Sequence, residues 1–238
     1  MTLMLASVLS SAEAETAVAC GADIIDCKDA RRGALGALPL DEVAKIVALV
    51  AKRRPVSTVV ELPHDVSQAR AAIQAAAATG VDFVKFALPM TPDLREVVDA
   101  LAPLCPKIRL VAVLFADLSP DLDVLPLLAR AGFHGVMLDT AHKGKGRLLD
   151  YVGVGALGDF VSRGRALGLS CGLAGSLEAP DAPRRAPKRA FGRGSDADAR
   201  DDPAPACAGA ALWRGRPRLR AQSCHAGGDR RLWPRARP

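Results

Sequence analysis

The stretch ATGVDFVKFAL, residues 78–88, contains the transition that decides the fold of this 238-residue chain. An alanine-rich helical pattern ends at Thr79, Gly80 follows as a left-handed C-cap, and a continuous apolar run then begins. The same helix–glycine–strand transition recurs at Gly21, Gly132 and Gly168. Strands that are apolar on both faces are typical of a parallel sheet that helices cover on both sides.

Apolar runs alternate with helical patterns along residues 1–177. The runs predict strands over 3–9, 22–27, 56–61, 82–88, 108–115, 134–139 and 169–174. Helical periodicity and start signals predict helices over 11–20, 40–53, 66–79, 91–104, 121–132 and 153–167. This order predicts an α/β fold, a (β/α)₈ TIM barrel with one unit still to come. A doubly wound open sheet is the alternative, but no G-x-G-x-x-G motif follows the first strand.

The composition changes abruptly after residue 177. Residues 178–238 contain no Ile and no Val, but 13 Arg, 14 Ala and 8 Pro. Such a segment buries too little apolar surface to offset the entropy lost on ordering. We therefore predict a catalytic barrel domain over 1–177 and a largely disordered or irregular tail over 178–238. The barrel is then incomplete, because strand eight and the closing helix are missing or replaced by the tail.

Two origins of the tail are consistent with its composition. One is a native, disordered basic extension. The other is a shifted reading frame in GC-rich DNA, because GC-rich codons favour Arg, Ala, Pro and Gly. The abrupt loss of all β-branched aliphatic residues favours the shifted frame.

The formal charge of +6 belongs to this tail, because residues 1–177 hold slightly more acidic than basic side chains. The tail arginines lack a fold and a pattern of aromatic residues to present them, so a nucleic-acid partner is not expected. No segment approaches the ~18–20 apolar residues of a membrane span. The short apolar start has no Lys or Arg before it, unlike a signal peptide. Six cysteines without a C-x-x-C pair indicate a reduced, cytoplasmic protein, and no metal-ligand spacing is present.

Three lysines stand where predicted strands end, namely Lys28, Lys85 and Lys143. Burying the amine of a lysine costs free energy unless its charge is paired or the amine is neutral, so a lysine in a buried strand indicates a functional role. The use that fits is amine chemistry on a carbonyl, with one lysine as nucleophile and another as proton carrier. Because all strands of a barrel end at one mouth, we expect these side chains to converge there.

Four stretches together resemble one known family: GADIIDCKDARRGALGA (21–37), VDFVKFAL (81–88), GVMLDTAHKGKGRLLDY (135–151) and GLSCGLAGSL (168–177). They resemble (5-formylfuran-3-yl)methyl phosphate synthase, the lyase of methanofuran biosynthesis. The resemblance implies a (β/α)₈ barrel that condenses two molecules of glyceraldehyde 3-phosphate through a lysine Schiff base. One phosphate and water are lost. It implies no cofactor, and it leaves self-association into a homo-oligomer open.

The resemblance also implies roles for individual residues. Lys28 corresponds to the Schiff-base lysine and Lys85 to the proton acceptor, with Asp26, Asp139 and Lys143 as orienting or proton-relaying groups. Gly175 and Ser176 lie in a stretch that resembles the phosphate loop after strand seven. Arg32, in the loop after strand two, is a further candidate phosphate ligand.

The chain departs from the family pattern at two places. The segment 57–63 lacks the usual glycine before its acidic residue, and the last strand with its G-x-R-G motif has no counterpart after Glu178. Two alternatives therefore stay open. The chain is another Schiff-base aldolase acting on sugar phosphates, or it is an inactive, truncated homologue with a nucleic-acid-binding tail.

Overall fold

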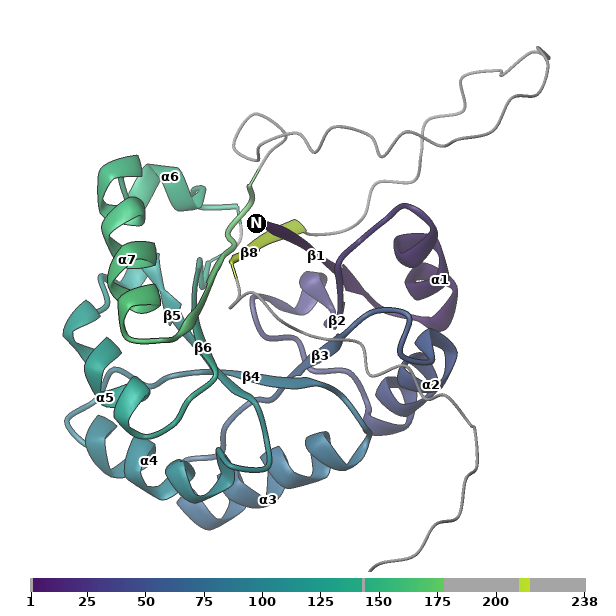
Figure 1. Ribbon diagram of the computed structural model, residues 1–238, viewed down its shortest axis with the longest axis horizontal. Coiled ribbons are helices and arrows are strands. Elements are labelled where there is room, and N and C mark those ends of the chain that lie inside the picture. The colour runs from purple at the N-terminus through teal and green to yellow at the C-terminus, as the bar shows by residue number, and fades with distance from the viewer. Residues whose placement is uncertain (1, 143, 178–209, 215–238) are drawn as a thin grey trace, which may run out of the picture.

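The computed structural model describes residues 2–142, 144–177 and 210–214, which form a barrel of strands surrounded by helices (Figure 1). The parallel strands are β1 (Leu3–Val8), β2 (Ile24–Cys27), β3 (Val56–Val59), β4 (Phe83–Ala87), β5 (Leu110–Phe115), β6 (Gly135–Asp139) and β7 (Ser170–Leu173). The helices are α1 (Ser11–Ala19), α2 (Leu40–Val50), α3 (Val66–Ala78), α4 (Leu94–Leu101), α5 (Leu125–Arg130), α6 (Leu148–Tyr151) and α7 (Val154–Ala166). Short 3₁₀ helices are η1 (Ala30–Arg32), η2 (Ala102–Leu104), η3 (Ala116–Leu118) and η4 (Leu122–Val124).

The strands β1 to β7 pair in sequence order, and each of these pairs is parallel. Leu5 lies opposite Ile24, for example, and Val113 lies opposite Met137. This arrangement confirms the predicted TIM-barrel fold. Because the seven strands run in the same direction, their carboxyl ends open at one common mouth.

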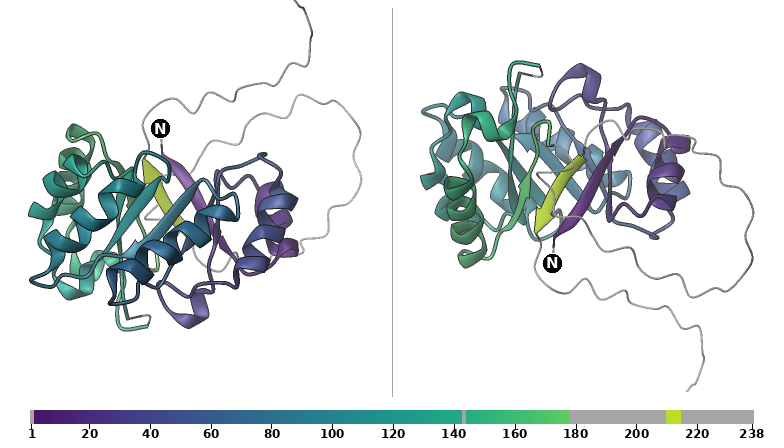
Figure 2. Two further views of the ribbon diagram at one scale, coloured as in Figure 1. Left: turned by 90° about the horizontal axis from the view of Figure 1, so that it is seen from below. Right: turned by 90° about the horizontal axis from the view of Figure 1, so that it is seen from above.

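The gap between β1 and β7 is filled by a strand from the segment that we expected to be irregular. β8 (Ala210–Arg214) pairs antiparallel with both neighbours and closes the barrel, and Figure 2 shows it beside β1 from two sides. An open barrel leaves unpaired N–H and C=O groups along two edges, which an extended segment can satisfy in either direction. The eighth strand is therefore present, but its direction is opposite to that of a regular eighth unit. Residues 178–209 and 215–238 lie outside the described part, so the predicted boundary at 177 and the predicted tail stay predictions.

The predicted elements agree with the structure within a few residues. All seven strands are present, and Gly21, Gly80, Gly132 and Gly168 have positive φ angles of 79–89° as their capping role requires. The predicted helices over 91–104 and 121–132 are each divided into an α-helix and a 3₁₀ helix, and α6 was not predicted. Among the described residues, no helix is both long and apolar enough to cross a membrane.

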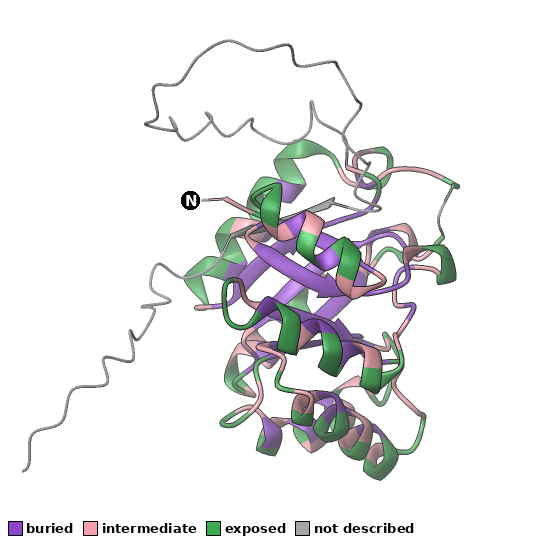
Figure 3. Ribbon diagram, turned by 90° about the vertical axis from the view of Figure 1, so that its right-hand side faces the viewer, coloured by how far each residue is buried: buried purple, intermediate pink, exposed green. Residues whose placement is uncertain are grey.

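The strands consist mainly of buried residues, whereas the helices are exposed on their outer sides (Figure 3). Buried side chains form one core inside the barrel and two between the strands and the helices. The inner core takes residues from strands around the barrel: Leu5, Ile24, Phe83, Val111, Val113, Met137 and Ala174. Because side chains alternate along a strand, the residues two positions further on also face inward. These next inward positions are Ser7, Asp26 and Lys85. The inside of the barrel is thus apolar at the level of the inner core and becomes polar toward the mouth.

Gly164 on α7 is required for close packing of this helix against β7. A Cβ atom at Gly164 would lie 2.4 Å from the Cys171 sulfur, whereas a Cβ at Gly158 on the same helix would meet nothing within 4 Å. We expect Gly164→Ala to destabilise the fold by about 1–3 kcal/mol through overpacking. Gly158→Ala, the matched control, is expected to stabilise it by about 0.5–1 kcal/mol through its helix propensity. Thermal unfolding of the two variants measures the difference, and equal melting temperatures would contradict this packing.

Candidate active site

An ion pair lies inside the barrel, just below its mouth. The Lys85 Nζ on β4 is 2.7 Å from Oδ2 of Asp26 on β2, and the side chains are 4% and 0% exposed. Two further donors reach the same carboxylate: Ser57 Oγ lies 2.6 Å from Oδ1, and Ser7 Oγ lies 3.4 Å from Oδ2. Both oxygens of the carboxylate therefore accept hydrogen bonds, which is what a buried charge needs.

A second lysine–carboxylate pair lies at the mouth itself. Lys28 directly follows β2, and its Nζ is 3.9 Å from Oδ2 of Asp139, the last residue of β6. In the closed strand order β2 and β6 lie on opposite sides of the barrel, so this pair spans the mouth. The Asp139 Oδ1 accepts a hydrogen bond from the Thr140 backbone N–H at 2.7 Å. With a side chain that is 10% exposed, Lys28 is more accessible than Lys85.

The two pairs act on each other electrostatically. Burial lowers the pKa of Lys85 below its ordinary value, and the nearby charge of Lys28 lowers it further, while Asp26 opposes both effects. Burial alone would raise the pKa of Asp26. The charges of Lys85 and Lys28, with hydrogen bonds from Lys85 and Ser57, outweigh burial and lower this pKa. The result is a stable carboxylate beside an amine that loses its proton more readily than an exposed lysine.

The loop after β7 lies at the same end of the barrel, against the loop after β6. Gly175 has φ +108°, and a Cβ there would lie 3.0 Å from Thr140 Cγ2, so only glycine fits without strain. The Gly175 carbonyl accepts a hydrogen bond from the Leu148 N–H at 2.9 Å. Ser176 is exposed with φ +52°, and its carbonyl accepts from Arg147 Nε at 3.3 Å.

Of the two remaining predicted site residues, only Arg32 is among those that the structure describes, and it is not part of this group. Arg32 is exposed on η1, and its Nη1 donates to the carbonyl of Ala37 at 3.1 Å within its own loop. Lys143 lies outside the described residues. The structure therefore brings together Lys28, Lys85, Asp26 and Asp139, and it holds Gly175 and Ser176 at the same mouth.

Three polar residues of the site were missed by the sequence reasoning. Ser7 and Ser57 bind Asp26, and their only signal is an inward position level with Asp26 on the neighbouring strands. Asp117 on η3 holds the loop after β6, because its carboxylate accepts from the N–H groups of Ala141 and His142 at 2.8 and 2.9 Å. No local motif marks Asp117.

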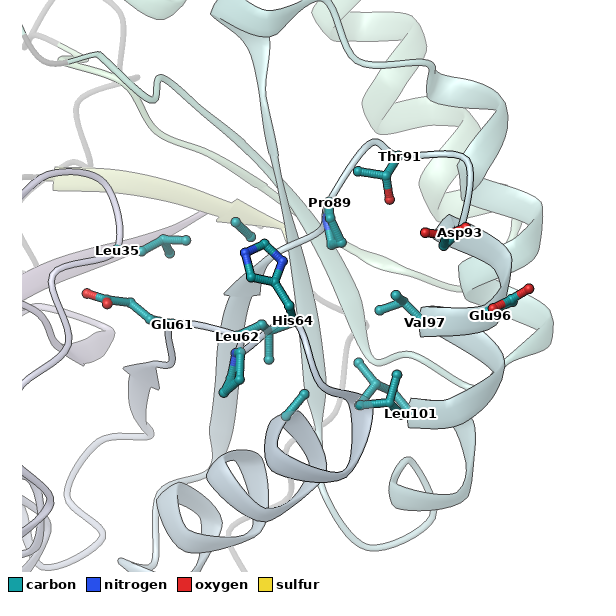
Figure 4. Close-up of a pocket in the computed structure, with 14 residues that line it drawn as sticks. Leu35, Glu61, Leu62, His64, Pro89, Thr91, Asp93, Glu96, Val97 and Leu101 are labelled. Carbon is teal, nitrogen blue, oxygen red and sulfur yellow. The ribbon is translucent and has the colours of Figure 1, made fainter.

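A cavity of about 560 Å³ lies beside the mouth, between the loops that follow β3 and β4 (Figure 4). Its lining includes Ala87, two residues beyond Lys85 on β4. Acidic Glu61, Asp93 and Glu96 line it together with His64, Thr91 and apolar side chains, and none of the described lysines and arginines does. This charge favours an uncharged group over a phosphate there. Among the described residues, no group of three His, Cys, Asp or Glu side chains is arranged to hold a metal ion.

Comparison with known proteins gives consistent matches over most of the chain. The family model described as 4-HFC-P synthase matches residues 4–187. A Methylorubrum extorquens protein, provisionally named (5-formylfuran-3-yl)methyl phosphate synthase, is 43% identical over 76% of this chain and 75% of its own length. The synthase of the same name from Methanopyrus kandleri is 33% identical over 76% of this chain and 81% of that protein.

Solved structures share the fold at much lower sequence identity. A Streptococcus agalactiae protein provisionally named copper homeostasis protein CutC has a TM-score of 0.63 at 12% identity, covering 76% of this chain and 91% of that chain. Dihydrodipicolinate synthase from Agrobacterium tumefaciens has a TM-score of 0.51 at 14% identity, covering 71% and 63%. At such identities the likeness concerns the barrel alone.

Proposed function

Because the chain belongs to the 4-HFC-P synthase family, we propose that it makes (5-formylfuran-3-yl)methyl phosphate from two molecules of glyceraldehyde 3-phosphate through a Schiff base on Lys28. The atoms balance when one phosphate and two water molecules leave, so no oxidant or reductant is needed. The observation that carries this proposal is the pair of lysines in one mouth, each facing a buried carboxylate. The curated relatives are named (5-formylfuran-3-yl)methyl phosphate synthase, which supports the same assignment.

Lys28 is the better nucleophile of the two because it is the more accessible lysine at the mouth. In its neutral form the amine attacks the carbonyl carbon of one triose phosphate, and water leaves to form the imine. The positive imine nitrogen acidifies the neighbouring C–H bond. Asp139, 3.9 Å from the Lys28 nitrogen, stabilises the cationic forms and is placed to exchange protons with the departing water.

Lys85 is the proposed proton acceptor. Burial favours its neutral form, which can take the proton from the carbon next to the imine. The resulting enamine attacks the aldehyde carbon of the second triose phosphate, which forms the new carbon–carbon bond. Asp26 holds the Lys85 amine in place and stabilises it after protonation.

The phosphate groups are proposed to bind away from the acidic cavity. Backbone N–H groups near Gly175 and Ser176 are the proposed phosphate loop, and Arg32 stays a candidate phosphate ligand. Lys143 stays a predicted orienting or proton-relaying group. Before Lys28 loses its proton, its charge also favours anionic triose phosphates over neutral aldehydes. Cytoplasmic location and self-association stay predictions.

Borohydride trapping tests the proposed intermediate. We expect the purified chain, treated with glyceraldehyde 3-phosphate and sodium borohydride, to gain the mass of one reduced triose-phosphate adduct on Lys28. Peptide mapping by mass spectrometry locates the adduct, and omission of substrate is the control. An adduct on a lysine other than Lys28 would contradict the assignment of Lys28 as the nucleophile.

Product analysis without borohydride separates the proposed reaction from its alternatives. Phosphorus NMR is expected to show one inorganic phosphate released for each furan aldehyde formed. An aldol product that keeps both phosphates would indicate another Schiff-base aldolase. Absence of any turnover would indicate the truncated, inactive homologue.

A further inference from the structure

Ser57, the second residue of β3, makes the shortest contact to the carboxylate of Asp26. Its Oγ donates to Asp26 Oδ1 at 2.6 Å, and both residues are almost completely shielded from solvent. The Ser57 hydroxyl lies below the mouth. Ser57 lines a small void together with residues of the inner apolar core, namely Leu5, Ile24, Phe83 and Val111. It is therefore placed to act on Asp26 and not on a bound substrate.

The two oxygens of Asp26 serve different partners. Ser57 occupies Oδ1, whereas Lys85 occupies Oδ2 at 2.7 Å. Ser7, on the opposite flank, also points to Oδ2 but at 3.4 Å, which is a weak contact. Ser57 is thus the group that sets the rotation of the carboxylate, and that rotation decides where Oδ2 holds the amine of Lys85.

We propose that Ser57 is a positioning residue of this enzyme, which fixes the Asp26 carboxylate so that Lys85 is held where it accepts the substrate proton. The inference rests on the proposed function, because it assigns Ser57 to the proton-transfer half of that reaction. The family resemblance assigns no role to Ser57. Its role follows from the contacts between β2, β3 and β4 alone.

Loss of the Ser57 hydroxyl is expected to change the pH at which Asp26 takes up a proton. The charged groups that act on it are Lys85 from β4 and Lys28 from the end of β2, and its own charge acts on the neighbouring Cys27 thiol. Asp139 from β6 acts on Lys85. The hydrogen bond from Ser57 lowers the pKa of Asp26 against the effect of burial. Without the hydroxyl, Asp26 takes up a proton at higher pH and then no longer holds a charged Lys85.

Three variants separate positioning from packing. Ser57→Ala removes the hydroxyl. Ser57→Thr keeps the hydroxyl and adds a methyl group next to a small void of about 10 Å³ that Ser57 lines. Thr58→Val is the matched control, since Thr58 is equally buried on the same strand but donates to the carbonyl of Cys27 at 3.4 Å. Ser7→Ala tests the weaker donor.

In Ser57→Ala we expect kcat for furan formation to fall about tenfold, with KM unchanged. Ser57→Thr restores kcat, Thr58→Val leaves it unchanged, and Ser7→Ala has a smaller effect, because a single hydrogen bond to a charged group is at stake only at Ser57 and Ser7. A Ser57→Ala enzyme with wild-type kcat, or a loss that Thr58→Val reproduces, overturns the proposal.

Acid unfolding provides a readout that does not need activity. Since the folded pKa of Asp26 is lowered, its stabilising effect is present above the unfolded pKa and is lost as pH falls through the folded pKa. Ser57→Ala is expected to shift the acid-unfolding midpoint to higher pH, and Thr58→Val is not. If the wild-type chain forms no furan while this shift is observed, the proposed function fails and the contact of Ser57 with Asp26 stands. If furan forms while Ser57→Ala keeps both the wild-type kcat and the wild-type acid-unfolding midpoint, only the inference about Ser57 fails.

Discussion

Replacement of Lys28 by methionine is expected to lower the rate of furan formation by about 10⁴-fold or more. Methionine keeps the length and much of the volume of the side chain but cannot form an imine, so the covalent route is lost entirely. Steady-state assays with glyceraldehyde 3-phosphate measure the rate, and borohydride treatment is expected to give no adduct. The fold should persist, because Lys28 stands at the mouth, outside the inner apolar core.

The matched control is Lys107→Met, which removes an exposed lysine far from any strand end that forms the mouth. It is expected to keep both wild-type turnover and the borohydride adduct. A Lys28→Met protein that still formed the furan at a rate within tenfold of wild type would rule out Lys28 as the nucleophile. An unchanged adduct in that protein would point to another lysine.

Replacement of Lys85 by methionine is expected to reduce both activity and stability. Loss of the proton acceptor lowers kcat by about 10²–10⁴-fold. The change also leaves Asp26 buried without its closest cation, which costs about 3–5 kcal/mol when one partner of a buried pair is removed. Without Lys85, burial raises the pKa of Asp26, so the stability deficit is largest at neutral pH and shrinks as pH falls and Asp26 is protonated.

The double variant Asp26→Asn/Lys85→Met separates the two effects. An uncharged asparagine still accepts from Ser57, so we expect most of the lost stability to return while activity stays absent. Thermal unfolding at several pH values and furan assays measure both quantities in one set of proteins. A double variant as unstable as Lys85→Met would show that the unpaired charge of Asp26 is not the cause of the lost stability.

The fold could be predicted almost completely from residues 1–177. Apolar runs of strand length and glycines such as Gly80 and Gly168 mark each turn from helix to strand, and the structure confirms them. α6 was missed because it contains four residues, too few to show a helical period. β8 was missed because its residues, Ala210–Arg214, stand in a segment whose composition predicts no strand.

The candidate site was predictable in part, and the reason lies in how its residues differ from their surroundings. Lys85 stands inside an apolar strand, so a charged side chain there was visible at once. Asp26 and Asp139 also interrupt apolar runs, but their roles came from the family resemblance. Ser57 and Asp117 carry no such contrast, because serine in a strand and aspartate in a loop are common.

By itself, the sequence determined the order, length and direction of the seven parallel strands, because the periods of side-chain burial and the capping glycines are local properties of the chain. Only the tertiary structure decided that Asp26 holds Lys85 while Asp139 faces Lys28. It also decided that a strand from residues 210–214 closes the barrel. These pairings depend on barrel closure, which brings distant residues together at distances that no local pattern encodes.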